Sequence, residues 1–354
     1  GRATGAQHRR GKGQESKIPI LAFDCLFITP ENRVASRDEL GPSEIEPCDV
    51  KISVAIDTSS GGIFAHVVQT QGVEDKRYSV DKLVDDVEWL GYSHISVKSD
   101  NEPAIVQVLK EVLKSLKVAS IDQAMEEHPA PYDSKGDGAV ENAAKQVQGL
   151  LRTHKSALEK SIGGSIPREH AVISWMVEYV AFLLTTRRVK DNGMTAYQHL
   201  RGKRFVQPLL CFGERCLWKL REKGPQRAEA SKIEPRWKRG IFVGFLRKTG
   251  EYWLWDPDTK DTVTSRCVNR LVKGKRFDAD ALTEISKTPH DKHVATSAPP
   301  VFQDLPPGEP AEVRPGRAAR GFDIYRRDVE RFGFTSEGLS LRQISEPTRL
   351  GMHS

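Results

Sequence analysis

The chain has few cysteines, and their spacing does not suit a zinc site or a disulfide framework. Its 354 residues contain five, with no Cys-x-x-Cys pair and no close cysteine and histidine cluster. Because the number is odd and no signal peptide precedes them, we expect free, mostly buried thiols in a reducing compartment. Cys211 and Cys216 could ligate a metal, but no second pair of ligands stands nearby.

The chain also lacks an apolar run long enough to cross a membrane, for which about 18 residues are needed. Hydrophobic residues make up 38% and charged residues 29%, which allows a packed core beneath a hydrated surface. The length suffices for two domains. Since the chain begins with Gly1 in a basic stretch and not with Met, we expect it to be a piece of a longer polypeptide.

Positive charge is concentrated in two places. The net charge is +6 and the pI is about 9.0, which favours a polyanionic partner. Residues 1–17 carry a net +4, and residues 201–240 carry a net +8, more than the excess of the whole chain. The second block is either a nucleic-acid contact or a solvated face.

Apolar periodicity predicts a first domain over residues 18–202, after a disordered basic tail over 1–17. The expected strands are 18–29, 50–57, 63–69, 94–99 and 118–125, and the expected helices are 80–90, 103–116, 139–160, 168–187 and 195–201. An acidic insertion occupies residues 30–49, and a glycine-containing loop occupies 131–138. The first three strands should form an antiparallel meander within a mixed five-stranded sheet that helices flank.

A small basic β-domain is predicted over residues 203–275. Short strand-like runs at 215–220, 239–245, 251–255 and 262–268 are separated by turn residues, which is typical of a small barrel or sandwich. Residues 276–354 are expected to be a proline-rich linker and disordered tail, with a short charged helix of unknown role near 322–334.

Three acidic residues stand where the expected elements could bring them together. Asp24 lies in the first apolar run, Asp100 follows the strand over 94–99, and Glu141 lies early in the helix after the loop. Carboxylates carried by two strands and a helix can hold two divalent cations. That arrangement serves the attack of water or a DNA 3′-hydroxyl on a phosphodiester.

Four blocks around these residues resemble the integrases of Copia-type retrotransposons and retroviruses, within the ribonuclease-H-like DDE recombinases. They are Ala-Phe-Asp-Cys at 22–25, Val-Ala-Ile-Asp-Thr-Ser-Ser-Gly at 54–61, Lys-Ser-Asp-Asn at 98–101, and the loop and helix start at 130–141. Downstream, Thr-Ala-Tyr at 195–197 and the runs at 239–245 and 252–257 are similar to the Copia-type C-terminal region. The resemblance covers about residues 18–275.

The resemblance implies a function and a set of site residues. Asp24, Asp100 and Glu141 would be the catalytic residues and would bind two Mg²⁺ or Mn²⁺ ions. The reaction would be processing of a 3′ DNA end followed by strand transfer into target DNA. The partners would be the element's DNA ends, target DNA and further copies of the chain, and no membrane is expected. The functional location would be the nucleus, after a cytoplasmic particle, and the protein would not be secreted.

Several further residues are candidates for DNA contact. Asn101 would support the metal-site loop, and Lys145, Gln148 and Arg152 share one helical stripe with Glu141. Gly136 and Gly138 would let the loop close on DNA. In the β-domain, Arg236, Lys238 and Arg239 would contact phosphates. The same helix stripe and loop could instead be solvated surface, and Trp218 and Trp237 could belong to the core of the β-domain.

Asp57 is an alternative to Asp24, because it also ends a strand; family strand order favours Asp24. The sequence departs from the family at several points. The separation of 41 residues from Asp100 to Glu141 is long, the acidic insertion lengthens the first hairpin, and Glu102 replaces a usual glycine. The family's upstream His/His/Cys/Cys zinc domain is not present in the sequence, so assembly on DNA ends is in question.

Two other functions compete with an active integrase. The first is a decayed or domesticated remnant that binds DNA without cutting it, and the second is a ribonuclease-H-like nuclease. The intact carboxylates favour activity, while Glu102 and the missing zinc domain favour decay. The basic β-domain distinguishes the chain from a simple nuclease, which would hydrolyse DNA but would not join it.

Overall fold

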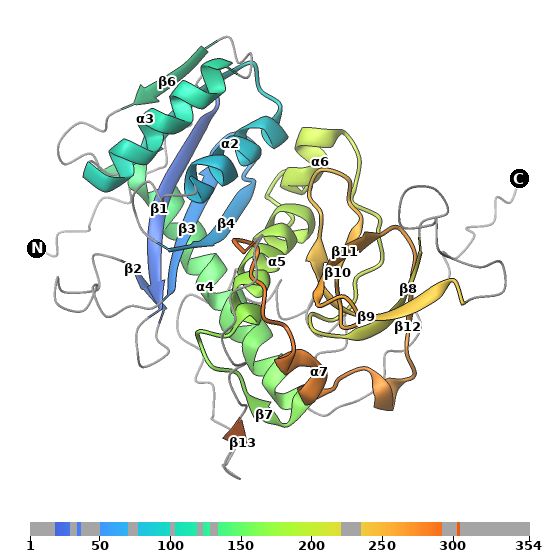
Figure 1. Ribbon diagram of the computed structural model, residues 1–354. Helices are drawn as coiled ribbons and strands as arrows, with labels where there is room; N and C mark the ends of the chain where they lie inside the picture. Colours follow the sequence, from blue (N-terminus) through green and yellow to red (C-terminus); the bar gives the residue numbers. More distant parts are fainter. Residues whose placement is uncertain are drawn as a thin grey trace, which may run out of the picture.

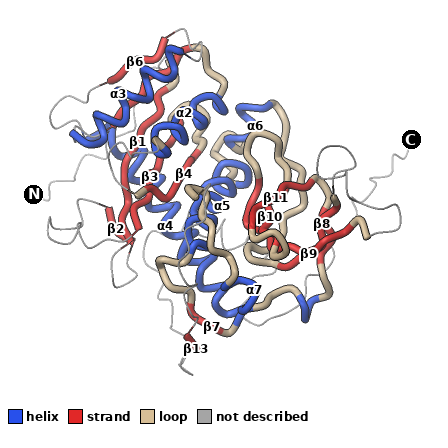
Figure 2. Tube along the Cα trace, in the orientation of Figure 1, coloured by secondary structure: helices blue, strands red, loops and turns tan. Residues whose placement is uncertain are grey.

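The computed structural model describes residues 18–28, 34–36, 50–69, 77–99, 103–118, 123–127, 134–220, 235–291 and 303–304. The predicted tail over 1–17, most of the acidic insertion and the predicted helix near 322–334 lie outside these ranges. Within them, the mixed sheet flanked by helices and the small β-domain that follows are both present, as predicted (Figures 1 and 2).

The first sheet has the strand order β4-β3-β1-β5-β6. Antiparallel pairing joins β1 (Ile20–Ile28) to β3 (Val50–Asp57) and β3 to β4 (Ile63–Val68), which confirms the predicted meander. On the other side of β1, the strands β5 (His94–Ser99) and β6 (Gln123–Glu127) run parallel. A short strand, β2 (Val34–Ser36), pairs with the end of β1 and makes the sheet six-stranded, where five strands were predicted.

Two pairs of helices cover the two faces of this sheet (Figure 1). The helices α2 (Tyr78–Leu90) and α3 (Pro103–Val118) pack on one face, where a core cluster includes Phe23, Cys25 and Phe64. The helices α4 (Ser134–Ile162) and α5 (Ala171–Arg187) pack on the other, where the core cluster includes Ala22 and Leu26. The alternation of side chains along β1 therefore divides its residues between two cores.

The second sheet forms the β-domain, with the order β11-β10-β9-β8-β12. Its strands are β8 (Arg215–Lys219), β9 (Trp237–Phe245), β10 (Tyr252–Asp256), β11 (Asp261–Ser265) and β12 (Val268–Arg270). All neighbouring strands are antiparallel. The predicted strand over 262–268 is therefore two strands, β11 and β12, separated by Arg266 and Cys267.

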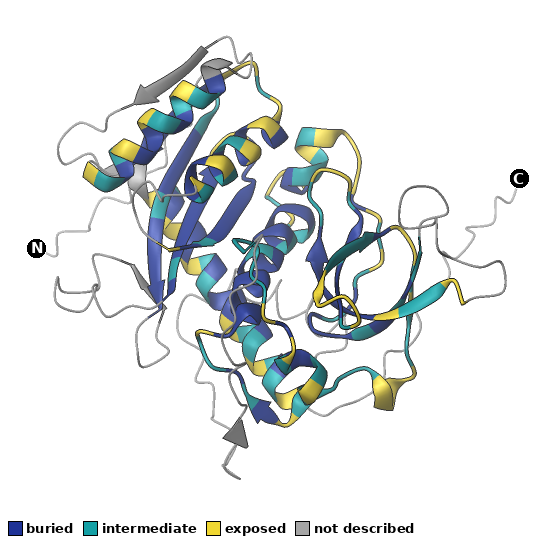
Figure 3. Cartoon of the chain, in the orientation of Figure 1, coloured by how far each residue is buried: buried dark blue, intermediate teal, exposed yellow. Residues whose placement is uncertain are grey.

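Helix α5 joins the two sheets into one core. Apart from Glu178, it carries apolar residues on nearly all sides, because the first sheet covers one side and the β-domain covers another. A helix with such surroundings has no need of a polar stripe. Phe182 of α5 stacks on Phe245 of β9 at 5.1 Å, and Tyr179 meets Phe242 edge-on at 5.5 Å. The boundary predicted at residue 203 therefore does not separate two independent cores. Figure 3 shows α5 as an almost wholly buried helix between the two parts.

The segment after the β-domain is packed where a linker was predicted. Residues 276–291 include a short helix, α7 (Ala279–Thr283), and the side chains of Leu282 and Ile285 are buried in the common core. The carbonyl of Lys287 accepts a hydrogen bond of 2.8 Å from the indole nitrogen of Trp175. The prediction of a linker is wrong for this stretch, because Phe277, Leu282 and Ile285 pack on the common core and no proline interrupts the run before Pro289.

Two element boundaries also differ from prediction. The strand predicted over 118–125 lies later, at β6, because α3 continues to Val118. Helix α4 begins at Ser134, so the second half of the predicted loop over 131–138 is helical. The short elements that complete the description are β7 (Gly164–Ser165), α6 (Ala196–Arg201), η3 (Lys273–Lys275) and β13 (Gln303–Asp304). None of the helices in the described ranges is long and apolar enough to span a membrane.

Candidate functional site

Asp24 lies in the middle of β1 on the face that α4 covers. Its neighbours Phe23 and Cys25 belong to the core under α2 and α3, whereas Ala22 and Leu26 belong to the core under α4 and α5. Because side chains alternate along a strand, Asp24 shares the face of Ala22 and Leu26. It is half-buried, and its Oδ1 accepts a hydrogen bond of 2.6 Å from the backbone N–H of Cys25.

Strand β5 runs beside β1 and ends at the residue before Asp100. The register pairs Ala22 with Lys98 and Phe23 with Ser99. The residue that precedes Asp24 is therefore opposite the residue that precedes Asp100. Asp100 and Asn101 themselves lie outside the described residues.

Glu141 lies on α4, on the same side of the sheet as Asp24. Its side chain is 49% exposed, and Lys145, one helical turn later, approaches it at 3.7 Å. Val140 and Ala144 beside it are buried in the core, which fixes the rotation of the helix. Gly138 is exposed and has open space where a Cβ would stand, and the side-chain surroundings of Gly136 lie outside the described residues.

The donor chemistry of these residues suits a hard divalent cation, because carboxylate oxygens are the ligands that Mg²⁺ and Mn²⁺ prefer. The structure describes two of the three predicted ligands, Asp24 and Glu141, and both belong to the α4 side of the sheet. Among the described residues, no three histidine, cysteine or acidic side chains form a metal-binding group. A three-carboxylate site would therefore need Asp100.

Asp57, the alternative to Asp24, is bonded within the β3–β4 hairpin. It is fully buried, and its carboxylate accepts hydrogen bonds from the backbone of Ser59 and Ser60, from the Ser60 hydroxyl, and from the Tyr92 hydroxyl at 2.8 Å. Burial and this carboxylate raise the pKa of Tyr92 to about 12. Asp57 pairs with Leu21, whose side chain lies in the core under α2. It therefore closes the β3–β4 hairpin on the face opposite to α4.

The predicted DNA contacts on α4 lie on its outer side. Lys145 and Arg152 are exposed and Gln148 is half-buried, while Val147 and Leu151 between them are buried. We call the four polar residues Glu141, Lys145, Gln148 and Arg152 the outer stripe of α4. A solvated helix face has the same geometry, so their contact with DNA stays a prediction.

The predicted basic residues of the β-domain lie at the start of β9. Arg236 and Arg239 are exposed, and Lys238 is half-buried and 3.8 Å from Asp258. Trp218 is buried and donates its indole N–H to the carbonyl of Arg239 at 3.2 Å, so it is a core residue. Trp237 is half-buried.

Two features of the structure were not predicted. The first is Lys98, which is buried on the same sheet face as Asp24, since its register partner is Ala22. A lysine within the apolar alternation of Ile95 and Val97 was the sequence signal for it. A buried cation on the sheet face of Asp24 would offset part of the repulsion among carboxylates brought together there.

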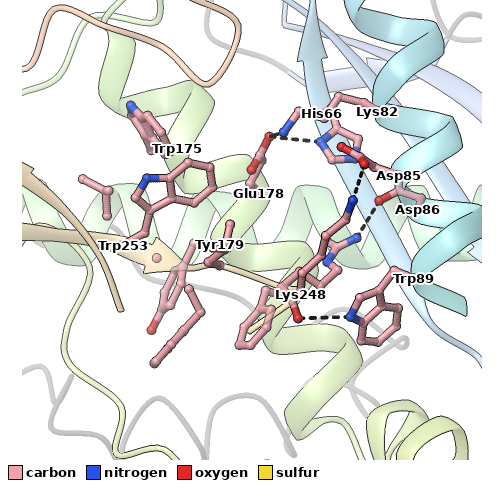
Figure 4. Close-up of a pocket in the computed structure, with 16 residues that line it drawn as sticks. His66, Lys82, Asp85, Asp86, Trp89, Trp175, Glu178, Tyr179, Lys248 and Trp253 are labelled. Carbon is pink, nitrogen blue, oxygen red and sulfur yellow. Dashed lines mark hydrogen bonds and ion pairs between the residues drawn. The ribbon is translucent and has the colours of Figure 1, made fainter. Parts of the chain in front are cut away.

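The second is a cavity of about 220 Å³ where the β-domain meets the first sheet (Figure 4). Its walls come from β4, α2, α5, β9, β10 and the β9–β10 turn. Trp175 and Trp253 line one side, with ring centroids 4.7 Å apart. Charged side chains from three of these elements and from the turn line the other side. Because they are distant in sequence, no local pattern links them.

One family model matches the chain. Residues 224–271 match the retroviral polymerase SH3-like domain, a stretch that contains β9, β10, β11 and β12. The chain matches no curated protein sequence. The family match confirms the resemblance to integrase-type proteins, and the Copia type stays a prediction.

Solved structures with a similar arrangement come from retroviruses. A chain in the cryoEM structure of the simian T-cell lymphotropic virus intasome with PP2A regulatory subunit B56 gamma is 17% identical, with a TM-score of 0.39, over 75% of this chain and 84% of that chain. The catalytic core domain of BIV integrase is 15% identical, with a TM-score of 0.33, over 51% and 92%. The HTLV-2 integrase catalytic core domain in complex with magnesium, in its trimeric form, is 14% identical, with a TM-score of 0.36, over 52% and 99%.

Proposed function

We propose that the chain is the catalytic module of a Copia-type integrase, a polynucleotidyl transferase that processes a 3′ DNA end and joins it to target DNA. The observation that carries the proposal is the arrangement around β1. Asp24 faces the α4 side, α4 carries Glu141 on that side, and β5 ends beside Asp24 immediately before Asp100. The match of residues 224–271 to a retroviral polymerase domain supports it independently.

In this proposal Asp24, Asp100 and Glu141 hold two Mg²⁺ or Mn²⁺ ions. When bound, the ions supply activation of the attacking hydroxyl and stabilisation of the leaving oxygen. The residues of the chain itself orient the reaction: the exposed Lys145 and Arg152 hold the donor DNA end along the outer stripe of α4, together with Gln148, and Asn101 supports the loop after β5. Lys98, buried on the sheet face of Asp24, supplies positive charge on that face.

The β-domain adds a basic surface to this site. Arg236, Lys238 and Arg239 contact phosphates of DNA in a salt-sensitive and sequence-tolerant way. The partners are the element's DNA ends and target DNA, and assembly of several copies brings two DNA ends together. The location of the active protein is the nucleus.

Two rival functions give different outcomes in one experiment. A DNA-binding remnant retains affinity for DNA but neither cuts nor joins it. A ribonuclease-H-like nuclease hydrolyses phosphodiesters in the presence of the metal but does not transfer a strand. The presence of the basic β-domain favours the integrase over the nuclease.

The test is Mg²⁺- or Mn²⁺-dependent joining of a labelled duplex end to plasmid DNA by the full chain. We expect Asp24→Asn and Asp100→Asn each to lower joining at least about a hundredfold, since loss of a metal ligand removes several kcal/mol of transition-state stabilisation. Asp81→Asn is the matched control, because Asp81 is an exposed carboxylate on α2, across the sheet. Asp57→Asn should lower stability and leave joining by the folded fraction intact.

The outcomes separate the three functions. Joining that survives in Asp24→Asn would overturn the assignment of the site. A natural chain that binds DNA but neither cuts nor joins it, also with a zinc domain supplied upstream, would favour the remnant. Cutting without joining would favour the nuclease.

A further inference from the structure

The cavity between the first sheet and the β-domain contains a row of alternating charges, which we call the joint: Lys82, Glu178, His66, Asp86 and Arg247. His66 of β4 lies at its centre, 2.8 Å from Asp86 of α2 through Nε2 and 3.1 Å from Glu178 of α5 through Nδ1. Lys82 reaches Glu178 at 2.9 Å, and Arg247 reaches Asp86 at 2.8 Å. Figure 4 shows Lys82, Glu178, His66 and Asp86 side by side at the cavity.

Both ring nitrogens of His66 face a carboxylate, so the joint is satisfied only by the protonated ring. An imidazolium donates from both nitrogens, whereas neutral imidazole donates from one and presents a lone pair at the other. In the neutral state either Asp86 or Glu178 would face that lone pair across about 3 Å, which is repulsive. The geometry alone therefore makes the joint depend on one proton.

The β-domain enters this joint through a single turn. Arg247, between β9 and β10, bonds to Asp86 and stacks on the ring of Phe64 at 4.4 Å, and its carbonyl accepts a hydrogen bond of 3.1 Å from the indole of Trp89. Lys248 adds a contact of 2.7 Å to Asp85 at the rim. Asp86 thus pairs both with Arg247 of the turn and with His66.

We propose that His66 makes the seating of the β-domain on the first sheet respond to pH: the protonated ring closes the joint, and loss of the proton loosens it. The inference does not depend on any catalytic activity. It concerns the β9–β10 turn, whose Arg247 contacts Asp86 and Trp89 of α2 and Phe64 of β4.

The charged groups around His66 set the direction of the effect. Burial alone would lower the pKa of His66, but Asp86 and Glu178 outweigh burial and raise it above the ordinary value of 6.5. Lys82 and Arg247 oppose protonation, while Asp85 and Glu88 of α2 lie farther out against Lys248. The hydroxyl of Tyr78, 3.4 Å from Glu178, and the ring of His290 against Tyr78 complete the surroundings.

The sign follows from linkage. Since the pKa of His66 is raised in the folded protein, its contribution is fully present below the unfolded value of 6.5. It is lost as the pH rises through the raised value. The β-domain should therefore be seated most firmly at mildly acidic pH and open more readily in mild alkali.

The test is hydrogen exchange of the full chain, measured between about pH 5.5 and 8.5, the range in which histidines titrate. The probes are the amides of residues 243–250 and the indole N–H of Trp89, with rates corrected for base catalysis. We expect protection at these probes to fall by as much as about tenfold per pH unit between pH 6.5 and the raised pKa of His66, and to level off above it, because opening releases one proton only in that range. His66→Gln, which cannot titrate, should abolish this dependence, and His154→Gln, a buried histidine on α4, should preserve it.

Two results would overturn the inference: protection at the turn that does not change with pH in the natural chain, or an equal dependence in His66→Gln. If His66→Gln does not fold, a measurement on the natural chain alone still tests the proposal. The NMR titration of the His66 ring should then give a midpoint above 6.5, and the Trp89 indole resonance should follow the same curve. A midpoint below 6.5, or an indole resonance that does not follow it, would refute the proposal.

Discussion

The joint and the outer stripe of α4 contain the same kinds of charged side chain in opposite surroundings. In the joint, Asp86 is 4% and Glu178 is 15% exposed, and each carboxylate accepts from a cation and from His66. On the outer stripe, Glu141 is 49% exposed and its cation, Lys145, is 3.7 Å away and 68% exposed.

The difference shows which charges belong to the architecture and which remain available to a ligand. A buried carboxylate is costly to leave unpaired, so the chain surrounds Asp86 and Glu178 with partners of its own. An exposed pair such as Glu141 and Lys145 contributes little to stability, and both residues can exchange partners freely.

The largest effect is expected from Asp86→Asn. The change leaves Arg247 and His66 without their buried carboxylate, and removal of one partner of a buried pair costs about 3–5 kcal/mol. The free energy of unfolding in urea measures the loss. Asp85→Asn, on the neighbouring position and 51% exposed, should change it by less than about 1 kcal/mol. Equal losses in the two variants would contradict the contrast between buried and exposed charges.

A smaller effect with a defined pH dependence is expected from His154→Gln. Burial lowers the pKa of His154 to about 4. This histidine therefore contributes to stability above pH 6.5, and the contribution is lost as the pH falls towards 4. The shift corresponds to at most about 3 kcal/mol. The unfolding free energy of His154→Gln should therefore decline less between these pH values than that of the natural chain.

His66 and His154 thus contribute to stability with opposite signs, because two carboxylates surround the first and burial alone acts on the second. The free energy of unfolding of His66→Gln should decline less towards alkaline pH than that of the natural chain. A decline towards pH 4 that is unaltered in His154→Gln would show that this ring is protonated in the folded protein.

The smallest effect on the fold is expected on the outer stripe. Arg152→Gln should leave the free energy of unfolding within about 0.5 kcal/mol of the natural value. It should weaken binding to DNA of any sequence and reduce the slope of log affinity against log salt by about 1. Lys114→Gln is the control, because Lys114 is 76% exposed on α3, across the sheet. The same slope for both variants would show that the outer stripe is only a solvated face.

The sequence predicted the secondary structure best where apolar residues recur with one period. The strands β1, β3, β4 and β5 and the helices α2 and α5 lie within about three residues of their predicted bounds, because alternation and helical spacing are local properties. Residues 276–291 were missed, because Leu282 and Ile285 have partners only in distant elements. The start of α4 was missed because Gly136 and Gly138 indicated a loop.

In the candidate site, too, local motifs could be predicted from the sequence and tertiary placement could not. Asp24, Asp100 and Glu141 could be proposed from short motifs at the ends of predicted elements. The structure adds that Asp24 and Asp57 lie on opposite faces of the sheet, and the catalytic role of Asp24 stays a prediction. Which face each one occupies depends on strand register, which the neighbouring strands and helices set.

By itself, the sequence determined the order of strands and helices, the excess of positive charge and the positions of three carboxylates in their motifs. These depend on local periodicity and composition. Only the tertiary structure decided that α5 would be shared by two sheets, that Asp57 would close a hairpin, and that His66 would lie between Asp86 and Glu178. Those outcomes require contacts between residues that are distant in sequence, such as His66 with Asp86, 20 positions apart, and Asp86 with Arg247, 161 positions apart. Packing of whole elements brings such residues together.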